Sequence, residues 1–278
     1  MTGAGPLRRR GLDGSAVAVY AVVAVFGLLV AGILASALLD SFASTWFGGW
    51  LPDGWTGRWY SYAGSEFDLR GILGTTAAVG LLVTALALVV GVPGAYILAR
   101  RSFPGKRLVV LLLILPMMVP PITYGIPLAT MLLEFRLAPS LAGVVIANLV
   151  PAMPFVLFVM IPFIERIDPN LERAARTLGA GLGRVFLRVL LPLALPGLLA
   201  AGLLVLVRTL ALFELTFLTA GAGSQTLVVA LYYAVFGAGV RPSQSIDAVA
   251  VVYMVTGLVP LLIALRVVNP VDVVARAR

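Results

Sequence analysis

Six long runs of apolar residues divide this sequence of 278 residues, and they constrain its fold more than any other feature. A hydrocarbon layer about 30 Å thick takes roughly 20 helical residues to cross, so each run is long enough to span a membrane. Backbone N–H and C=O groups in lipid must pair within their own segment, and each run is therefore predicted to be a helix. The six runs lie at residues 15–39, 71–99, 107–133, 141–164, 191–219 and 246–265.

Composition supports an all-α integral membrane protein with six transmembrane helices. Hydrophobic residues make up 61% of the chain, charged residues make up 12%, and the mean hydropathy is +1.06, which excludes an ordinary soluble domain. The ten-residue alternating segments of an outer-membrane barrel are not visible in the sequence. The first run resembles a signal peptide in position, but it is longer than a usual signal core, so we read it as an uncleaved first span.

The distribution of basic residues predicts the orientation. With the N-terminus inside, fifteen of the 20 Lys and Arg residues fall on the cytoplasmic side, as the positive-inside rule requires. This gives cytoplasmic tails at 1–14 and 269–278, a first span at 15–39, an extracytoplasmic loop at 40–70 and a core domain at 71–268. The net charge of +8 then reflects topology and anionic inner-leaflet lipid, and does not indicate a nucleic-acid partner.

Several kinds of chemistry are excluded by residue types that the sequence lacks. There is no His and no Cys, which removes the commonest general bases, thiol nucleophiles and zinc ligands. Lys106 follows Gly105, but Arg100 stands where a phosphate-binding loop needs its first Gly. We therefore expect no catalytic residue, no metal site and no cofactor in this chain. If ATP drives its activity, another subunit must bind the nucleotide.

The polar loop at 165–190 is predicted to hold a short exposed helix. Asp168 and Pro169 form an N-cap and a first helical position, and Glu172 falls in the first turn, where the helix dipole favours an acid. Gly179 is predicted to end the helix with a change of direction. An apolar face beside arginines suits docking into a groove on a soluble partner. The alternative is an amphipathic helix lying on the inner leaflet.

The same loop resembles the cytoplasmic EAA loop of ABC importer permeases, whose pattern is Glu-Ala-Ala, three residues, Gly, nine residues, then Ile-x-Leu-Pro. Arg173 stands at the position of the motif Glu, with Glu172 one residue earlier, and Val189 replaces the Ile. The positions that match the pattern are Ala174, Ala175, Gly179, Leu191 and Pro192.

This resemblance implies the MetI-like fold of type I ABC importer permeases, with a cytoplasmic coupling helix in the loop at 165–190. It implies a second permease subunit, giving a heterodimer, and two ABC ATPase subunits that bind ATP and Mg. An extracytoplasmic solute-binding protein would deliver the solute, and the location would be the bacterial inner or plasma membrane. The seven coupling-loop residues would be Glu172, Arg173, Ala174, Ala175, Gly179, Leu191 and Pro192.

Other segments resemble one branch of this family. Residues 56–60, 167–172 and 177–180 are similar to permeases for polyamines, ferric iron, thiamine and phosphonates. The acidic pair that polyamine permeases often carry in the fifth span falls here on Leu210 and Ala211, which weakens a polycation as substrate. The expected substrate is a small polar solute of this group, and a carbohydrate is the alternative.

Arg208 and Glu214 are the ionisable residues within the fifth predicted span, where a charge is costly and usually faces a bundle interior. Six residues correspond to about 600° of helical turn, so on a continuous helix the two would not share a face. Arg208 would lie roughly 24 Å along that helix from Pro192, at a rise of 1.5 Å per residue. Both are candidates for lining a translocation path. The alternative for Arg208 is outward snorkelling or structural pairing with another subunit.

Prolines are predicted to kink or break the third span, near Tyr124, and broken helices often border a substrate path. Tyr124 and Asn148, in the fourth span, are therefore further path candidates. Residues 226–239 are apolar but too few to span, and are predicted to form an extracellular or re-entrant helix. The competing classes are a secondary transporter, which would need embedded acids for ion coupling, and an intramembrane protease, which would need a catalytic set that is absent here.

Overall fold

The computed structural model describes residues 14–47, 49–237, 239 and 241–267. The predicted tails at 1–14 and 269–278 lie outside these residues, except for Gly14. Within the described part the regular structure is helical, joined by turns and loops, and it includes one isolated bridge between Ala43 and Trp55. Its elements are α1 (Gly14–Phe42), α2 (Arg58–Glu66), α3 (Leu69–Arg100), α4 (Lys106–Met118), α5 (Pro121–Glu134), α6 (Leu141–Glu165), α7 (Pro169–Thr177), α8 (Leu182–Val185), a π-helical turn (Phe186–Leu190), α9 (Leu191–Leu193), α10 (Leu195–Ala211), α11 (Glu214–Thr219), α12 (Leu227–Phe236) and α13 (Ser243–Val267).

Four helices are each long and apolar enough to cross a membrane, namely α1, α3, α6 and α13. Two helix pairs, α4 with α5 and α8–α9 with α10, meet the same criterion when each bent pair is counted as one span. The six predicted segments are thus present, four as single helices and two as broken ones. The all-α membrane fold predicted from the apolar runs is confirmed.

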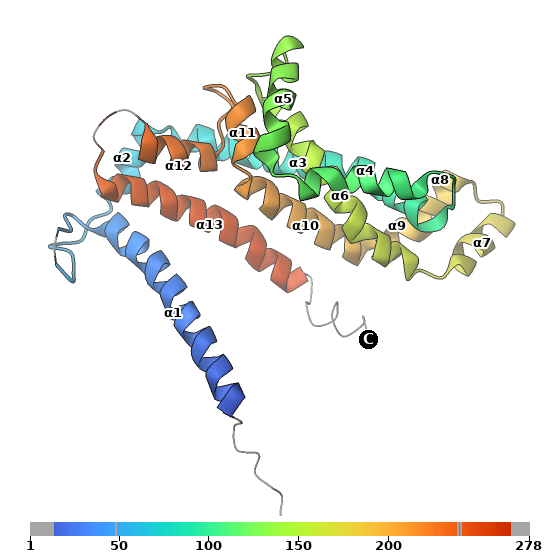
Figure 1. Cartoon of the computed structure of the whole chain (residues 1–278), viewed down its shortest axis with the longest axis horizontal. Helices are drawn as coiled ribbons and strands as arrows, with labels where there is room; N and C mark the ends of the chain where they lie inside the picture. The colour runs from blue at the N-terminus through green and yellow to red at the C-terminus, as the bar shows by residue number, and fades with distance from the viewer. Residues whose placement is uncertain (1–13, 48, 238, 240, 268–278) are drawn as a thin grey trace, which may run out of the picture.

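The third span breaks where the prolines predict. α4 ends at Met118, and α5 begins at Pro121 with its axis turned by 100° (Figure 1). Pro120 is extended, with φ −54° and ψ 133°, and Pro121 occupies the first helical position, where its missing N–H costs no hydrogen bond.

The prediction of a continuous fifth helix over 191–219 is wrong. Helical structure starts earlier, at Leu182, and α10 is turned by 76° from the segment before it. Pro196 opens α10 and has no N–H to continue the ladder, so the bend falls there. A second break at Leu212 separates α10 from α11. The predicted helical distance and angle between Pro192, Arg208 and Glu214 therefore do not apply.

The core lies where α3 packs against α6, and α10 packs against both of these helices. Gly91 allows the close approach, since a Cβ there would lie 2.7 Å from Cγ1 of Val156. Fully buried side chains from the three helices fill the contact, and dense packing of this kind is what holds helices together in an apolar solvent. They include Val79, Val83, Ala87, Val156, Met160, Ala201 and Val205.

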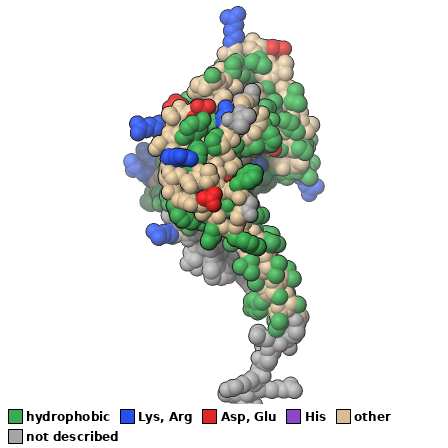
Figure 2. Space-filling view, turned by 90° about the vertical axis from the view of Figure 1, so that its left-hand side faces the viewer, with side chains coloured by type: hydrophobic (Ala, Val, Ile, Leu, Met, Phe, Trp, Pro, Cys, Tyr) green, Lys and Arg blue, Asp and Glu red, His purple; other side chains and the backbone are tan. Residues whose placement is uncertain are grey.

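α1 stands apart from this core. Its neighbours are α13 and α2, and it runs away from the body of the molecule in Figure 1. Figure 2 shows this limb coated with hydrophobic side chains, in keeping with exposed residues such as Phe26 (67%) and Leu28 (72%).

α12 confirms the prediction of a short helix within 226–239. Its first residue, Leu227, donates its N–H to Oγ1 of Thr76 on α3 over 2.9 Å. Thr76 in turn donates to the carbonyl oxygen of Ile72 over 2.6 Å. This pair of bonds fixes α12 to α3 at a buried point.

Candidate functional site

The helix predicted in the 165–190 loop is α7, and both of its ends are formed by the predicted residues. Oδ1 of Asp168 accepts the N–H of Asn170 over 2.9 Å, and Pro169 is the first helical residue. Gly179 has φ +83°, a left-handed conformation that favours Gly. The N–H groups of Gly179 and Ala180 donate back into the last turn, so the chain leaves α7 through a closed turn.

Glu172 turns inward from α7 and is buried, with its side chain 8% exposed. Tyr96 Oη donates to Oε2 over 2.8 Å, and Arg100 Nε donates to Oε1 over 2.8 Å. Arg100 also donates from Nη2 to the carbonyl oxygen of Ile167 over 2.5 Å, and Arg176 lies 3.9 Å from Oε2. Charge-assisted bonds such as these are stronger than neutral ones, so they fix α7 to the end of α3.

Sequence reasoning missed Tyr96 and Arg100 as site residues. The two are four residues apart at the end of an apolar helix, so both project on one side toward α7. That spacing was the available signal, although Arg100 entered the prediction only as a residue that replaces the first Gly of a phosphate-binding loop and as one of the basic residues.

The opposite face of α7 is open. Arg173 and Ala174 are exposed, Ala175 is half-buried, and Leu178 just beyond the helix is 88% exposed. The structure therefore keeps the predicted small apolar face available for contact.

Leu191 and Pro192 lie outside α7, at the end of the π-helical turn that packs against it. Leu191 is half-buried and Pro192 is exposed. At the start of the same turn, the ring of Phe186 lies edge to face against Tyr96, with the centroids 5.7 Å apart. Tyr96 therefore contacts both segments of the predicted loop.

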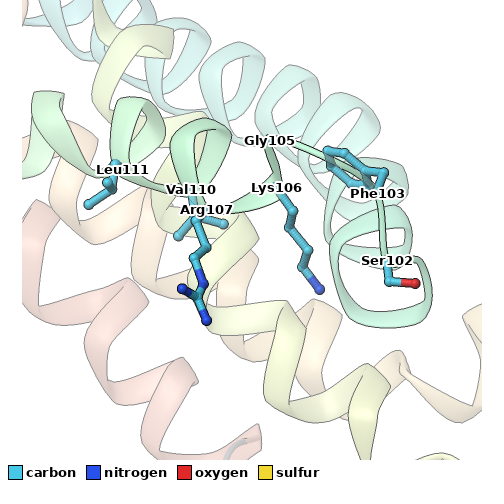
Figure 3. A pocket seen from close by; sticks show the side chains of 7 residues that line it. All are labelled: Ser102, Phe103, Gly105, Lys106, Arg107, Val110 and Leu111. Atoms are coloured by element: carbon cyan, nitrogen blue, oxygen red, sulfur yellow. The ribbon is translucent and has the colours of Figure 1, made fainter.

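Two hollows lie at this end of the molecule. One, of about 210 Å³, lies between α7 and the end of α3 and is lined by Tyr96, Arg100, Arg101, Pro169, Glu172, Arg173 and Arg176. The other, of about 720 Å³, lies at the start of α4 and is shown in Figure 3, where Lys106 and Arg107 extend to the same side. Lys106 Nζ donates to the carbonyl oxygen of Arg101 over 3.3 Å, a bond that links one lining residue of each hollow.

Arg208 and Asn148, two of the predicted path residues, line one small pocket of about 10 Å³ between α6 and α10. A pocket of this size has room for about one water molecule. Asn148 is 1% exposed and donates from Nδ2 to Val144 O over 2.8 Å and to Thr216 Oγ1 over 3.2 Å. Cζ of Arg208 lies 5.2 Å from the ring centroid of Phe155, a cation–π contact.

Within the described part of the chain, no carboxylate lies within 4.0 Å of Arg208. Tyr124 packs instead in an apolar cluster with Leu215, and Glu214 is the half-buried first residue of α11. The structure thus brings two of the four path candidates into one pocket and leaves the other two outside it.

Residues 91–271 match the sequence profile of a family described as "Binding-protein-dependent transport system inner membrane component". Among curated proteins, the trehalose transport system permease SugB of Mycobacterium tuberculosis is 36% identical over 129 residues, which is 46% of this chain and 47% of that protein. The molybdenum transport system permease ModB of Haemophilus influenzae is 35% identical over 178 residues, or 58% of this chain and 76% of that protein. The chain thus spans about half the length of the first relative and three quarters of the second.

Two solved transporters share the fold. A chain of a bacterial ABC transporter that imports the acidic polysaccharide alginate superposes with a TM-score of 0.75 at 20% identity, covering 96% of this chain and 99% of that one. A chain of the MetNI methionine ABC transporter, in an inward-facing conformation, superposes with a TM-score of 0.57 at 21% identity, covering 75% of this chain and 97% of that one.

Proposed function

Because this chain belongs to the family of binding-protein-dependent transport system inner-membrane components, and is thus a permease subunit of an ABC importer, we propose that it forms a solute path together with a second, related permease. Two cytoplasmic ATPase subunits bind ATP and Mg and grip the 165–190 loops of the permease pair. A solute-binding protein outside the membrane delivers the solute. The basic α7 end and both chain termini face the cytoplasm, in keeping with the positive-inside rule.

The observation that carries this proposal is the clamp of Tyr96 and Arg100 on Glu172. Bonds of 2.8 Å to both carboxylate oxygens make α7 rigid with α3 while its opposite face stays open. One face of α7 is bonded to α3, and the opposite face is open to the ATPase. A displacement of α7 by the ATPase is therefore transmitted to α3 and to the helix bundle. ATP-driven closure of the ATPases thereby moves the bundle between inward-open and outward-open states.

The solute is small and polar, from the group that includes polyamines, ferric iron, thiamine and phosphonates. Arg208 meets no carboxylate within 4.0 Å among the described residues, which favours an anion such as a phosphonate within that group. The 35% identity to a molybdenum transport permease shows that relatives of this chain also serve solutes outside this group. A carbohydrate is the second candidate, favoured by the 36% identity to the trehalose permease.

The test is affinity purification of the tagged chain in mild detergent, with mass spectrometry of the subunits that accompany it. We expect a second permease and an ATPase, and ATP hydrolysis that rises when the binding protein and a matching anion are added. A chain that purifies alone and transports solute without an ATPase would overturn the proposal in favour of a secondary carrier.

A further inference from the structure

Four arginines surround the 210 Å³ hollow between α3 and α7: Arg100, Arg101, Arg173 and Arg176. The only acid among its lining residues is Glu172. Like charges gathered around one hollow raise the local positive potential, so an anion placed among them is attracted.

Glu172 carries a single negative charge for the four arginines. Its oxygens accept from Arg100 and Tyr96 at 2.8 Å, and Arg176 forms a longer ion pair with it at 3.9 Å. Arg101 and Arg173 are exposed, and their side chains make no ion pair or hydrogen bond with any residue that the structure describes. The hollow therefore keeps an uncompensated positive charge directed outward.

The hollow also lies where a partner can reach it. Figure 1 shows α7 at one end of the molecule, beyond the end of α6. Leu178, just beyond the end of α7, is 88% exposed and offers an apolar contact.

We propose that this hollow receives a carboxylate side chain, Asp or Glu, from the ATPase subunit that docks on α7. This inference rests on the proposed function and names the chemistry of the contact. Arg173, exposed at the position of the motif Glu, supplies the cation at the mouth of the hollow. In the contact between α7 and the ATPase, the permease thus contributes basic side chains and the ATPase contributes an acidic one.

A lipid phosphate is the other anion available at a membrane surface, and α7 is poorly suited to it. A helix that lies in the interface needs a broad apolar face. α7 offers one large exposed apolar side chain, Leu171 at 45%, with Asn170, Arg173 and Arg176 also exposed. The hollow is moreover built from two elements, which suits a single inserted side chain.

Charge reversal in the intact complex tests the contact. We expect Arg173→Glu to lower the amount of ATPase retained through a wash at moderate salt by at least tenfold, and Arg173→Gln to lower it less. Arg184→Glu is the matched control, because Arg184 is exposed on α8 and does not line the hollow. We expect the control to retain the ATPase as the unmodified chain does.

A photo-crosslinking amino acid in place of Asn170, which is exposed beside the hollow, identifies the contact. We expect crosslinks to an ATPase peptide containing Asp or Glu, and an acid-to-Arg change there should restore retention of Arg173→Glu. Equal retention by Arg173→Glu and the unmodified chain, or crosslinks only to lipid, would overturn this inference and leave the proposed function standing. An ATPase that fails to accompany even the unmodified chain would overturn both.

Discussion

Nε of Arg100, the last residue of α3, donates to Oε1 of Glu172 in α7 over 2.8 Å, and both side chains are largely buried. The ion pair joins residues 72 positions apart and connects a membrane span to the helix outside it. Glu172 thus holds α7 against α3, while the neighbouring Arg173 is exposed to solvent. The displaced Glu of the motif and the Arg that replaces it therefore have different roles.

Removing the charge of Glu172 should loosen α7. Glu172→Gln keeps the shape but leaves Arg100 without its carboxylate, and a hydrogen bond to a charged group contributes about 1.5–3 kcal/mol. We expect ATP hydrolysis that no longer depends on solute in the reconstituted transporter, with transport reduced at least fivefold. Glu165→Gln, at an exposed acid just before α7, is the control. Coupled transport at the unmodified rate would mean that the clamp has no role.

The turn after α7 should depend on Gly179. Its φ of +83° costs a residue with a Cβ about 1–2 kcal/mol, although a Cβ there would meet no atom within 4 Å. We expect Gly179→Ala to lower transport, because a cost of about 1 kcal/mol shifts the equilibrium away from this turn by about fivefold. Gly181→Ala, at φ −68° and with equally open space, should leave transport unchanged. Equal effects of the two substitutions would rule out backbone strain as the cause.

Gly91 should be sensitive to a single added methyl group. A Cβ there would lie 2.7 Å and 2.8 Å from two atoms of Val156, so α3 and α6 would have to separate. Overpacking of this kind costs about 1–3 kcal/mol, and we expect Gly91→Ala to lower the thermal unfolding midpoint in detergent by several degrees. Gly74→Ala on the same helix, with no atom within 4 Å, is the control. An unfolding midpoint for Gly91→Ala equal to that of this control would contradict the close packing.

Thr76→Val should weaken the attachment of α12. Val has the shape of Thr but cannot accept the N–H of Leu227, and a buried unpaired donor costs about 1–3 kcal/mol. We expect faster proteolysis near α12 and a lower unfolding midpoint. Thr75→Val is the adjacent control, because its hydroxyl makes no hydrogen bond to a described residue. Unchanged proteolysis in Thr76→Val would show that α12 is held by other contacts.

Arg208→Gln should lower solute transport without releasing the ATPase from the permease. If Arg208 attracts the solute, its loss should lower the transport rate at least tenfold at subsaturating solute, while the ATPase stays bound. Arg70→Gln, at an exposed arginine of α3, is the control. A loss of the second permease from the purified complex would instead assign Arg208 to pairing between subunits.

The sequence predicted those features that depend on local chemistry. The prolines at 120 and 121 predicted the break in the third span, and Asp168 and Gly179 predicted both ends of α7. Each of these effects acts within a turn or two of the residue that causes it, so no tertiary information was needed.

Features that depend on distant contacts were not predictable in the same way. The apolar run over 191–219 gave no sign that Pro196 would end one helical segment and open another at 76°, since prolines are often accommodated within membrane helices. The partners of Glu172 lie 72 and 76 residues away, and no helical periodicity reports such a pairing. The sequence therefore predicted the loop helix that carries Glu172, but not the two residues of α3 that bind this side chain.

The 32 residues of α3 give a rod about 48 Å long, at a rise of 1.5 Å per residue. Arg100, clamped to α7, is at one end of this rod, and Thr76, which holds α12, lies near the other. If the rod pivots about its far end, a displacement of 2 Å at Arg100 tilts it by only about 2°. A single helix thus connects α7 at one end to α12 at the other. A small displacement of α7 changes the tilt of α3, and this change of tilt reaches the contact with α12.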